Sequence, residues 1–241
     1  MDDKPLFPSR KYQHIFFDLD HTLWDFDTNS THALSVLYQD KLKNHGFSFE
    51  DFMSHYRKIN EACWSQYRTG NMTKGILRVK RFFDTFLALG FEDEYLAKYF
   101  ADTYLEISPY QTALMPGAHT LLSGLKSRDY ILHLITNGFE EVQSIKIREC
   151  KLDTYFEEII ISEQVGYNKP HPKVFLHALE RSNATPAHSL MVGDNYEADV
   201  LGAQHVGIDC VWFNPGYAKS VENNEAKYEV RSLLEINDLL P

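Results

Sequence analysis

The sequence predicts an α/β fold, a parallel sheet with crossover helices and with a helical domain inserted after its first strand. Two observations support this prediction. Short apolar runs typical of buried strands recur at residues 15–17, 131–135, 159–161, 190–192 and 210–212. After residue 116 these runs alternate with helical patterns, which is typical of a parallel sheet with crossover helices.

The stretch between the first apolar run and Pro116 contains no strand-like run and indicates about four successive helices. Ser48 to Asp51 resembles a capping box at a helix start. Three glycines stand where these helices should end: Gly46, Gly70 and Gly90. In the third helix, apolar residues at helical spacing predict a packed face: Ile76, Leu77, Val79, Phe82, Phe83, Phe86 and Leu87.

The second half of the chain supplies the crossover helices that a parallel sheet needs. They are expected at about 118–128, 140–150, 172–182 and 196–206. A polar segment from Ser220 to Lys227 predicts a surface loop before a last short strand at residues 229–232.

Composition excludes several classes of protein. The 241 residues are 44% hydrophobic and 24% charged, as in a soluble globular protein. No apolar run is long enough to span a bilayer, and residues 1–5 lack the apolar core of a secretion signal, so we expect a cytoplasmic protein without a membrane partner. The net charge of −10 argues against nucleic-acid binding but not against a small phosphorylated substrate.

The cysteines point to neither a disulfide framework nor a zinc site. Cys63, Cys150 and Cys210 are odd in number, widely spaced and without a Cys-x-x-Cys pair. We expect three reduced, packed thiols.

The first candidate site follows the first apolar run directly. Asp18 and Asp20 stand at the expected carboxyl end of a buried strand, where open α/β sheets place their ligands. Two carboxylates so close repel each other unless a cation or a proton intervenes. An acidic turn that caps the next segment is an equally good interpretation of this motif alone.

Three further polar motifs follow later strands. Thr136 and Asn137 supply a hydroxyl and an amide for an anionic oxygen, although Asn-Gly is also an ordinary turn. Lys169 carries a point charge suited to a phosphoryl group, although most lysines are solvated surface. Asp194 and Asp199 add two more carboxylates. Each motif is weak alone, but together they supply a nucleophile, a proton donor, an anion site, a cation and metal ligands.

With these four motifs in order, the chain resembles the haloacid dehalogenase superfamily of phosphohydrolases over nearly its whole length. The resemblance implies a doubly wound Rossmann-like catalytic core from residues 1–27 and 113–241, and a helical cap at 28–112 that selects the substrate. It also implies an aspartyl-phosphate mechanism with Mg²⁺ as cofactor. The true dehalogenases of the superfamily lack the second aspartate, so Asp20 argues against carbon–halogen hydrolysis.

The resemblance gives each motif residue a role. Asp18 is implied as the nucleophile and Asp20 as the general acid and base. Thr136 and Asn137 are implied to bind phosphate together with Lys169. The implied metal ligands are Asp18, Asp194 and the backbone carbonyl of Asp20, and Asp199 is implied as an outer acid that orients Lys169 or a metal-bound water.

Local strings narrow the resemblance to the bacterial pyrimidine 5′-nucleotidases of this superfamily, which act on noncanonical nucleoside monophosphates. These strings are Trp24 to Asp27, Thr136 to Phe139 and Ser162 to Gly166, with a cap string of Asn60, Trp64, Tyr67, Gly70 and Arg81. Trp64 or Tyr67 could stack on a base and Arg81 could meet a phosphate or carbonyl, although cap packing or solvated surface explains them as well. The implied substrate is a nucleoside monophosphate.

Three alternatives stay open on the sequence alone. A sugar-phosphate or phosphoglycolate phosphatase would share every core residue. A phosphomutase would need the aspartyl phosphate to survive while the substrate turns around. A catalytically silent binding protein on the same fold has no need of both Asp18 and Asp20. The sequence does not fix the oligomeric state.

Overall fold

The computed structural model describes residues 11–216, 221 and 224–240. Residues 1–5, on which the expectation about a secretion signal depends, lie outside this range, as do Ser220, Glu222 and Asn223 of the predicted surface loop. The chain divides into two compact units. The core unit comprises Met1–Asp25, Leu114–Glu140 and Lys151–Pro241, and the helical unit comprises Phe26–Ala113 and Glu141–Cys150.

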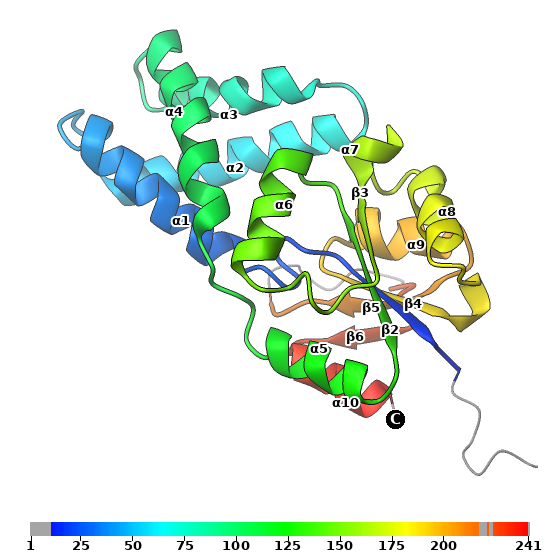
Figure 1. The fold of residues 1–241 in the computed structure, drawn as a ribbon. Coiled ribbons are helices and arrows are strands. Elements are labelled where there is room, and N and C mark those ends of the chain that lie inside the picture. Colours follow the sequence, from blue (N-terminus) through cyan, green and yellow to red (C-terminus); the bar gives the residue numbers. More distant parts are fainter. Residues whose placement is uncertain (1–10, 217–220, 222–223, 241) are drawn as a thin grey trace, which may run out of the picture. The chain divides into compact units, whose positions relative to one another are not determined.

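The core unit is built on a parallel sheet of six described strands (Figure 1). They are β1 (His14–Phe17), β2 (Ile131–Thr136), β3 (Glu158–Ile161), β4 (Ser189–Gly193), β5 (Asp209–Phe213) and β6 (Tyr228–Val230). The five predicted apolar runs are confirmed as strands, and the last strand lies slightly earlier than expected. The strand order β3-β2-β1-β4-β5-β6 is doubly wound and reverses direction at β1.

The register of the strands brings the predicted motifs to one edge of the sheet. Phe17 at the end of β1 pairs with Leu134 of β2 and with Val192 of β4. The carboxyl ends of these three strands are therefore nearly level. Because ligands of doubly wound sheets bind where the strand order reverses, this edge is where the fold favours a site.

Helices cover both faces of the sheet (Figure 1). On one face, α8 (Pro172–Arg181) and α9 (Gly202–Gln204) bury an apolar cluster that includes Phe16, Met191 and Trp212. Elsewhere in the core unit, α5 (Ala118–Ser127) packs against η5 (Leu233–Glu235) and α10 (Ile236–Leu239). Shorter segments are α7 (Ser162–Val165) and η3 (Pro186–His188).

The crossover helix expected at 196–206 is irregular. Residues Tyr196–Leu201 form a π-helical segment, η4, before the short α9 begins. Asn195 caps this segment, since its side chain accepts a hydrogen bond from the Ala198 N–H. π-Helical turns occur often at functional sites, and this one carries Asp199.

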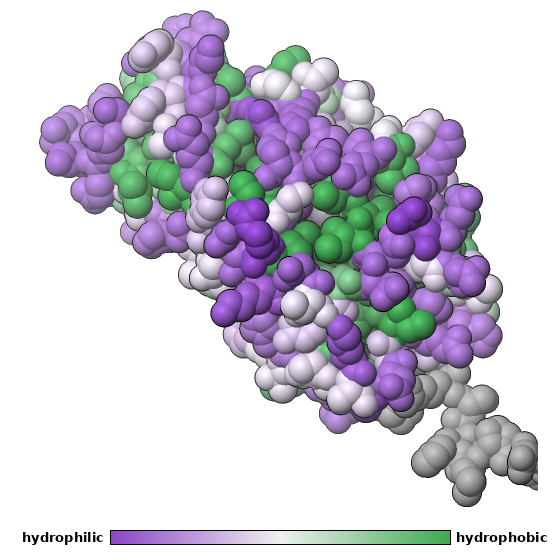
Figure 2. Space-filling view, viewed as in Figure 1, coloured by the Kyte–Doolittle hydropathy of each residue, from purple (hydrophilic) through white to green (hydrophobic). Residues whose placement is uncertain are grey.

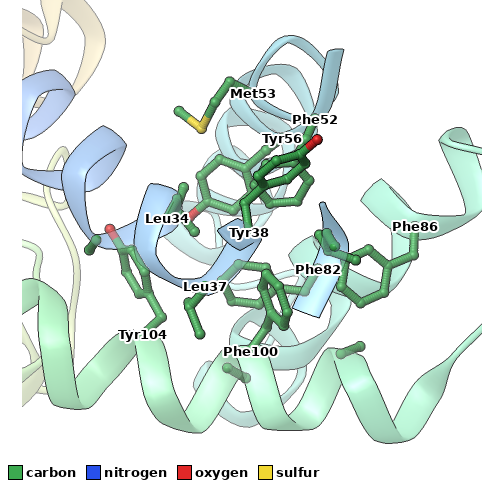
Figure 3. Close-up of a cluster of buried hydrophobic side chains, with 14 residues drawn as sticks. Leu34, Leu37, Tyr38, Phe52, Met53, Tyr56, Phe82, Phe86, Phe100 and Tyr104 are labelled. Carbon is green, nitrogen blue, oxygen red and sulfur yellow. The ribbon is translucent and has the colours of Figure 1, made fainter. Parts of the chain in front are cut away.

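The helical unit is an all-α assembly. Its first segment, residues 26–113, forms α1 (Phe26–Leu37), η1 (Tyr38–Leu42), α2 (Phe49–Arg68), α3 (Lys74–Ala88), α4 (Glu94–Ile107) and η2 (Ser108–Tyr110). Its interior is strongly aromatic, with Phe52, Tyr56, Phe82 and Phe100 turned toward one another (Figure 3). Ring contacts such as Tyr56 with Phe82, 5.3 Å between centroids, add specific geometry to this apolar burial.

Local signals in this unit are confirmed, with one correction. Ser48 and Asp51 form the predicted capping box, and Gly46, Gly70 and Gly90 have positive φ beyond their helices. The packed face predicted for α3 is narrower than expected. Leu77, Phe82 and Phe86 are fully buried, whereas Ile76 is 54% exposed and Leu87 is 46% exposed, because both lie beside the stripe rather than on it.

One helix from the second half of the chain belongs largely to the helical unit. Helix α6 (Glu140–Glu149) follows β2, yet residues 141–150 cluster with the insert. The Glu141 carboxylate pairs with Lys74, 2.7 Å away, and with Arg78, both on α3. Ion pairs that join elements so distant in sequence could not be read from a strand-and-helix pattern.

Other sequence expectations also have an outcome. Cys63, Cys150 and Cys210 are free and buried, as predicted. Among the described residues, no helix is both long and apolar enough to cross a membrane. On the face shown in Figure 2, apolar residues lie among hydrophilic ones.

Candidate active site

Asp18 occupies the first position after β1 and is 7% exposed. Its N–H donates to the Val192 carbonyl, 2.9 Å away, which continues the β1–β4 pairing by one residue. The chain then turns tightly, because the N–H groups of Leu23 and Trp24 both donate to the Leu19 carbonyl at 2.9 and 2.8 Å. His21 takes a left-handed conformation within this turn, with φ of 63°.

Lys169 links the strand ends through its ammonium group. Its Nζ donates to Asp18 Oδ1 and to Asp199 Oδ1, both at 2.6 Å, and to the Ile135 carbonyl at 2.8 Å. The residue is 1% exposed. Burial by itself would lower the pKa of Lys169, but Asp18 and Asp199 outweigh it and the pKa is raised. Lys169 is therefore a fully charged buried cation with anionic partners.

Asp194 and Asp199 follow β4, and their placement depends on Gly193. A Cβ at position 193 would lie 2.4 Å from the Asp199 carboxyl carbon, so only glycine allows this approach. The Asp199 carboxylate also accepts from the Asn195 N–H at 3.0 Å. Asp194 accepts a hydrogen bond from the Thr22 hydroxyl at 3.3 Å, and its carbonyl accepts from the Trp212 indole at 2.9 Å.

Three of these carboxylates form a group that could hold a metal ion. One oxygen each from Asp18, Asp194 and Asp199 lies within 4.8 Å of the others. Burial raises the pKa of Asp18 well above its ordinary value against the effect of Lys169, and burial with the charge of Asp199 does the same for Asp194. Two buried acids and the partly exposed Asp194, grouped in this way, fit a divalent cation with hard oxygen ligands, such as Mg²⁺.

Thr136 and Asn137 lie at the end of β2, as predicted. Thr136 is 1% exposed, and its hydroxyl accepts from the Gly138 N–H at 3.2 Å. The Asn137 carboxamide contacts the backbone of Lys169 at both ends, with Nδ2 2.9 Å from the carbonyl oxygen and Oδ1 2.8 Å from the nitrogen. Asn137 is therefore held against Lys169, a contact that the sequence does not predict.

Asp20 lies two residues after Asp18 and is partly exposed. Its backbone pairs with that of Trp24 in an isolated bridge. Its carboxylate does not belong to the group formed by Asp18, Asp194 and Asp199. Asp20 thus lies on the turn that follows the candidate nucleophile.

The three cap residues singled out in the sequence lie in the helical unit. Trp64 and Tyr67 on α2 are partly exposed, with their rings edge to face and 5.5 Å between centroids. Arg81 on α3 is 3% exposed, donates from Nη1 to Asn60 Oδ1 at 3.2 Å, and stacks against Phe82 and Tyr104. These contacts favour a packing role for Arg81.

Three residues of the site carried no role in the sequence interpretation. Thr22 contacts Asp194, Trp212 contacts the Asp194 carbonyl, and the Ser162 hydroxyl donates to Asn137 Oδ1 at 2.7 Å. Thr22 and Ser162 are both fully buried. Only Ser162 directly follows an apolar run, which was an available signal; Thr22 lies five residues after β1 and Trp212 lies within β5, so the sequence pattern gave no comparable signal for them.

Comparison with known proteins finds relatives over nearly the whole length of the chain. The pyrimidine 5′-nucleotidase PynA of Streptococcus pneumoniae is 32% identical over 232 residues, which cover 95% of each chain. The pyrimidine 5′-nucleotidase YjjG of Escherichia coli is 34% identical over 231 residues, 95% of this chain and 98% of that one. A glyceraldehyde 3-phosphate phosphatase of Pyrococcus furiosus is 31% identical over 234 residues, covering 96% and 92%.

A solved structure shows the same fold. The HAD-hydrolase YfnB of Bacillus subtilis, bound to magnesium, superposes with a TM-score of 0.86 at 29% identity, covering 96% of this chain and 99% of that chain. The family model described as haloacid dehalogenase-like hydrolase matches residues 12–207, well over half of the sequence. This chain belongs to the haloacid dehalogenase-like hydrolase family.

Proposed function

We propose that this protein is a magnesium-dependent phosphomonoester hydrolase that forms an aspartyl phosphate on Asp18. The observation that carries the proposal is the contact between Asp18 and Lys169, 2.6 Å apart and buried at the point where the strand order reverses. A carboxylate held beside a fixed cation is suited to attack a phosphorus atom whose surrounding oxygens need charge neutralisation.

The proposed reaction has two steps. In the first, a carboxylate oxygen of Asp18 bonds to phosphorus, the bond to the leaving oxygen breaks, and Asp20 gives that oxygen a proton. In the second, Asp20 takes a proton from water, the water oxygen bonds to phosphorus, and Asp18 is released with inorganic phosphate. Lys169 neutralises charge on the phosphoryl oxygens in both steps, and the Thr136 hydroxyl is assigned to bind one of them.

The proposed metal is held by Asp18, Asp194 and the backbone carbonyl of Asp20. Bound Mg²⁺ would supply charge neutralisation and orientation of the phosphoryl group. Asp199, which bonds both Lys169 and the Asn195 N–H, is assigned to orient Lys169. A chelator should stop phosphate release and added magnesium should restore it. Full activity in excess chelator would rule out the metal.

The proposed substrate is a pyrimidine nucleoside 5′-monophosphate. Support comes from PynA and YjjG, whose names give this activity and which are similar to this chain over 95% of its length. A sugar phosphate is the second candidate, because the Pyrococcus furiosus relative is a glyceraldehyde 3-phosphate phosphatase of nearly equal identity. Phosphate release should be measured with substrates of both classes in the presence of magnesium. The class with the higher kcat/KM is the substrate class of the enzyme.

The helical unit is assigned to substrate selection, and Trp64 provides the test. If its partly exposed ring stacks on a base, Trp64→Ala should raise KM for a pyrimidine nucleotide by about tenfold, since base stacking is worth roughly 1–3 kcal/mol. Hydrolysis of a small aryl phosphate, which has no base, should change much less. Arg81→Ala is the contrast: its buried contacts predict a loss of stability and equal effects on both substrates.

A further inference from the structure

The Asn137 side chain brackets the backbone of Lys169. Its Oδ1 lies 2.8 Å from the Lys169 nitrogen and its Nδ2 lies 2.9 Å from the Lys169 carbonyl oxygen. An N–H can only donate and a carbonyl can only accept, so this pairing fixes the orientation of the amide. One side chain thus satisfies both main-chain polar groups of the lysine, as a neighbouring strand would.

Ser162 holds the Asn137 side chain in this position. Its hydroxyl donates to Asn137 Oδ1 at 2.7 Å, and the residue is fully buried at the first position of α7. The Asn137 oxygen therefore accepts two hydrogen bonds, one from Ser162 and one from Lys169. Because both acceptor positions of this oxygen are filled, the carboxamide has little freedom to rotate toward a ligand.

The other end of Lys169 is fixed as well. Its ammonium group donates to Asp18, to Asp199 and to the Ile135 carbonyl. A lysine side chain has four rotatable bonds, and their freedom would spread the charge over several positions if the backbone moved. Holding the backbone at both polar groups places the ammonium where three acceptors meet.

We propose that Asn137 and Ser162 are positioning residues that hold the main chain of Lys169 and so aim its ammonium group at Asp18. This inference rests on the proposed function, and it changes the role expected for Asn137 from binding phosphate to placing the cation that does. Preorganised charge is effective in catalysis because it needs no reorganisation during the reaction. Loss of the bracket should therefore affect the transition state more than substrate binding.

The kinetic test uses small changes and a matched control. Ser162→Ala removes one donor to Asn137, and Asn137→Asp keeps the shape but sets a carboxylate against the Lys169 carbonyl. We expect kcat to fall by about tenfold in the first and about 10²-fold in the second, with KM nearly unchanged, since misplaced electrostatic stabilisation lowers kcat. Ser162→Thr, which retains the hydroxyl, should recover activity relative to Ser162→Ala.

Ser189→Ala is the control. Ser189 is also fully buried, and its hydroxyl donates to the Thr185 carbonyl at 2.7 Å, at the opposite end of the sheet from Lys169. This variant should lose a similar amount of thermal stability and keep wild-type kcat. If Ser162→Ala and Ser189→Ala have equal kcat, or if the Asn137 variant raises KM at constant kcat, the positioning role is wrong.

A second measurement does not depend on catalysis. The ammonium group of Lys169, buried with three acceptors, should give a protected proton–nitrogen NMR signal, assigned by its loss in Lys169→Met. The signal should survive in Ser189→Ala and shift or broaden in Asn137→Asp. An unchanged signal in Asn137→Asp would overturn the proposal. A wild type without phosphatase activity but with this NMR response would refute the proposed function alone.

Discussion

The two ends of the central sheet both bury ionisable groups, in opposite ways. At the carboxyl ends, Asp18, Lys169 and Asp199 form a network of opposite charges. Toward the amino ends, His14 and His133 are buried with 3.0 Å between Nδ1 and Nε2. Burial lowers the pKa of both histidines, to about 4 for His133.

The difference lies in the partners that each group has. Lys169, buried beside carboxylates, has a raised pKa, stays charged and can act on a ligand. A buried base beside another base loses its proton instead, because neither can stabilise the charge of the other. We therefore expect changes at the carboxyl ends to alter activity, and changes at the amino ends to alter stability, with its pH dependence in the case of the histidines, but not activity.

The largest effect is expected for Asp18→Asn. The amide keeps the shape but has no nucleophilic carboxylate, so phosphate release should fall by at least ~10⁴-fold, as for other catalytic nucleophiles. Melting temperature should stay near the wild-type value, because Lys169 keeps its contact with Asp199. In the wild type, beryllium fluoride should be found on Asp18. A fluoride adduct on another residue would contradict the assignment of the nucleophile.

Asp20→Asn should separate the two proposed proton transfers. General acid–base help is worth about 10²–10⁴ in rate, so turnover of a nucleoside monophosphate should slow by that range. The phenolate of an activated aryl phosphate leaves without needing a proton, so the first step should stay fast while hydrolysis of the intermediate is slow. Rapid-quench kinetics should then show a burst of phenolate followed by slow turnover. A variant that hydrolyses nucleoside monophosphate at the wild-type rate would remove Asp20 from the mechanism.

Lys169→Met tests the charge network itself. The change leaves Asp18 and Asp199 without their shared ammonium, so we expect about 3–5 kcal/mol lower unfolding free energy and about 10²–10³ lower kcat. Urea denaturation and steady-state kinetics measure the two effects. The double variant Lys169→Met, Asp199→Asn should regain part of the stability but none of the activity. Equal stability of the single and double variants would show that the loss of stability in Lys169→Met does not come from uncompensated negative charge.

The sequence predicted much of this site because the fold repeats one rule. Each apolar run that became a strand ends beside a polar residue, and parallel strands bring those ends together. Asp18, Thr136 and Asp194 could be singled out on that basis, whereas Lys169 was chosen from the segment between the third apolar run and the next helix. Their spatial order could not, since strand order is set by helix packing and crossovers rather than by any local pattern.

Interactions between distant side chains were beyond the sequence. Nothing in an Asn-Gly pair indicates that Asn137 will bracket Lys169, because the contact depends on the register of β2 and β3. The exposed positions of Ile76 and Leu87 were missed for a related reason: spacing defines a helical stripe but not its width. The histidine pair likewise needs β1 and β2 to be neighbours.

That pair gives the smallest predicted effect, which is confined to mildly acidic solution. His133 has a folded pKa of about 4, below the roughly 6.5 of an unfolded histidine. Between these values the unfolded chain binds more protons, so the stability contribution is complete above pH ~6.5 and is lost as pH falls toward 4, by up to ~3 kcal/mol.

His133→Phe should remove that dependence while keeping the ring stacked on Phe16, 4.7 Å away in the wild type. The other titratable groups near the pair and their partners, Glu158 with Arg181 and the exposed His188, remain in place in this variant. Urea denaturation at pH 7 and pH 5 should show a smaller loss of stability on acidification than in the wild type, by about 2 kcal/mol.

The control is His205→Gln, a change at an exposed histidine, and this variant should lose as much stability on acidification as the wild type does. Because the pair lies away from the carboxyl ends of the strands, kcat of His133→Phe at neutral pH should match the wild type. A large loss of kcat would show that the two ends of the sheet are not independent.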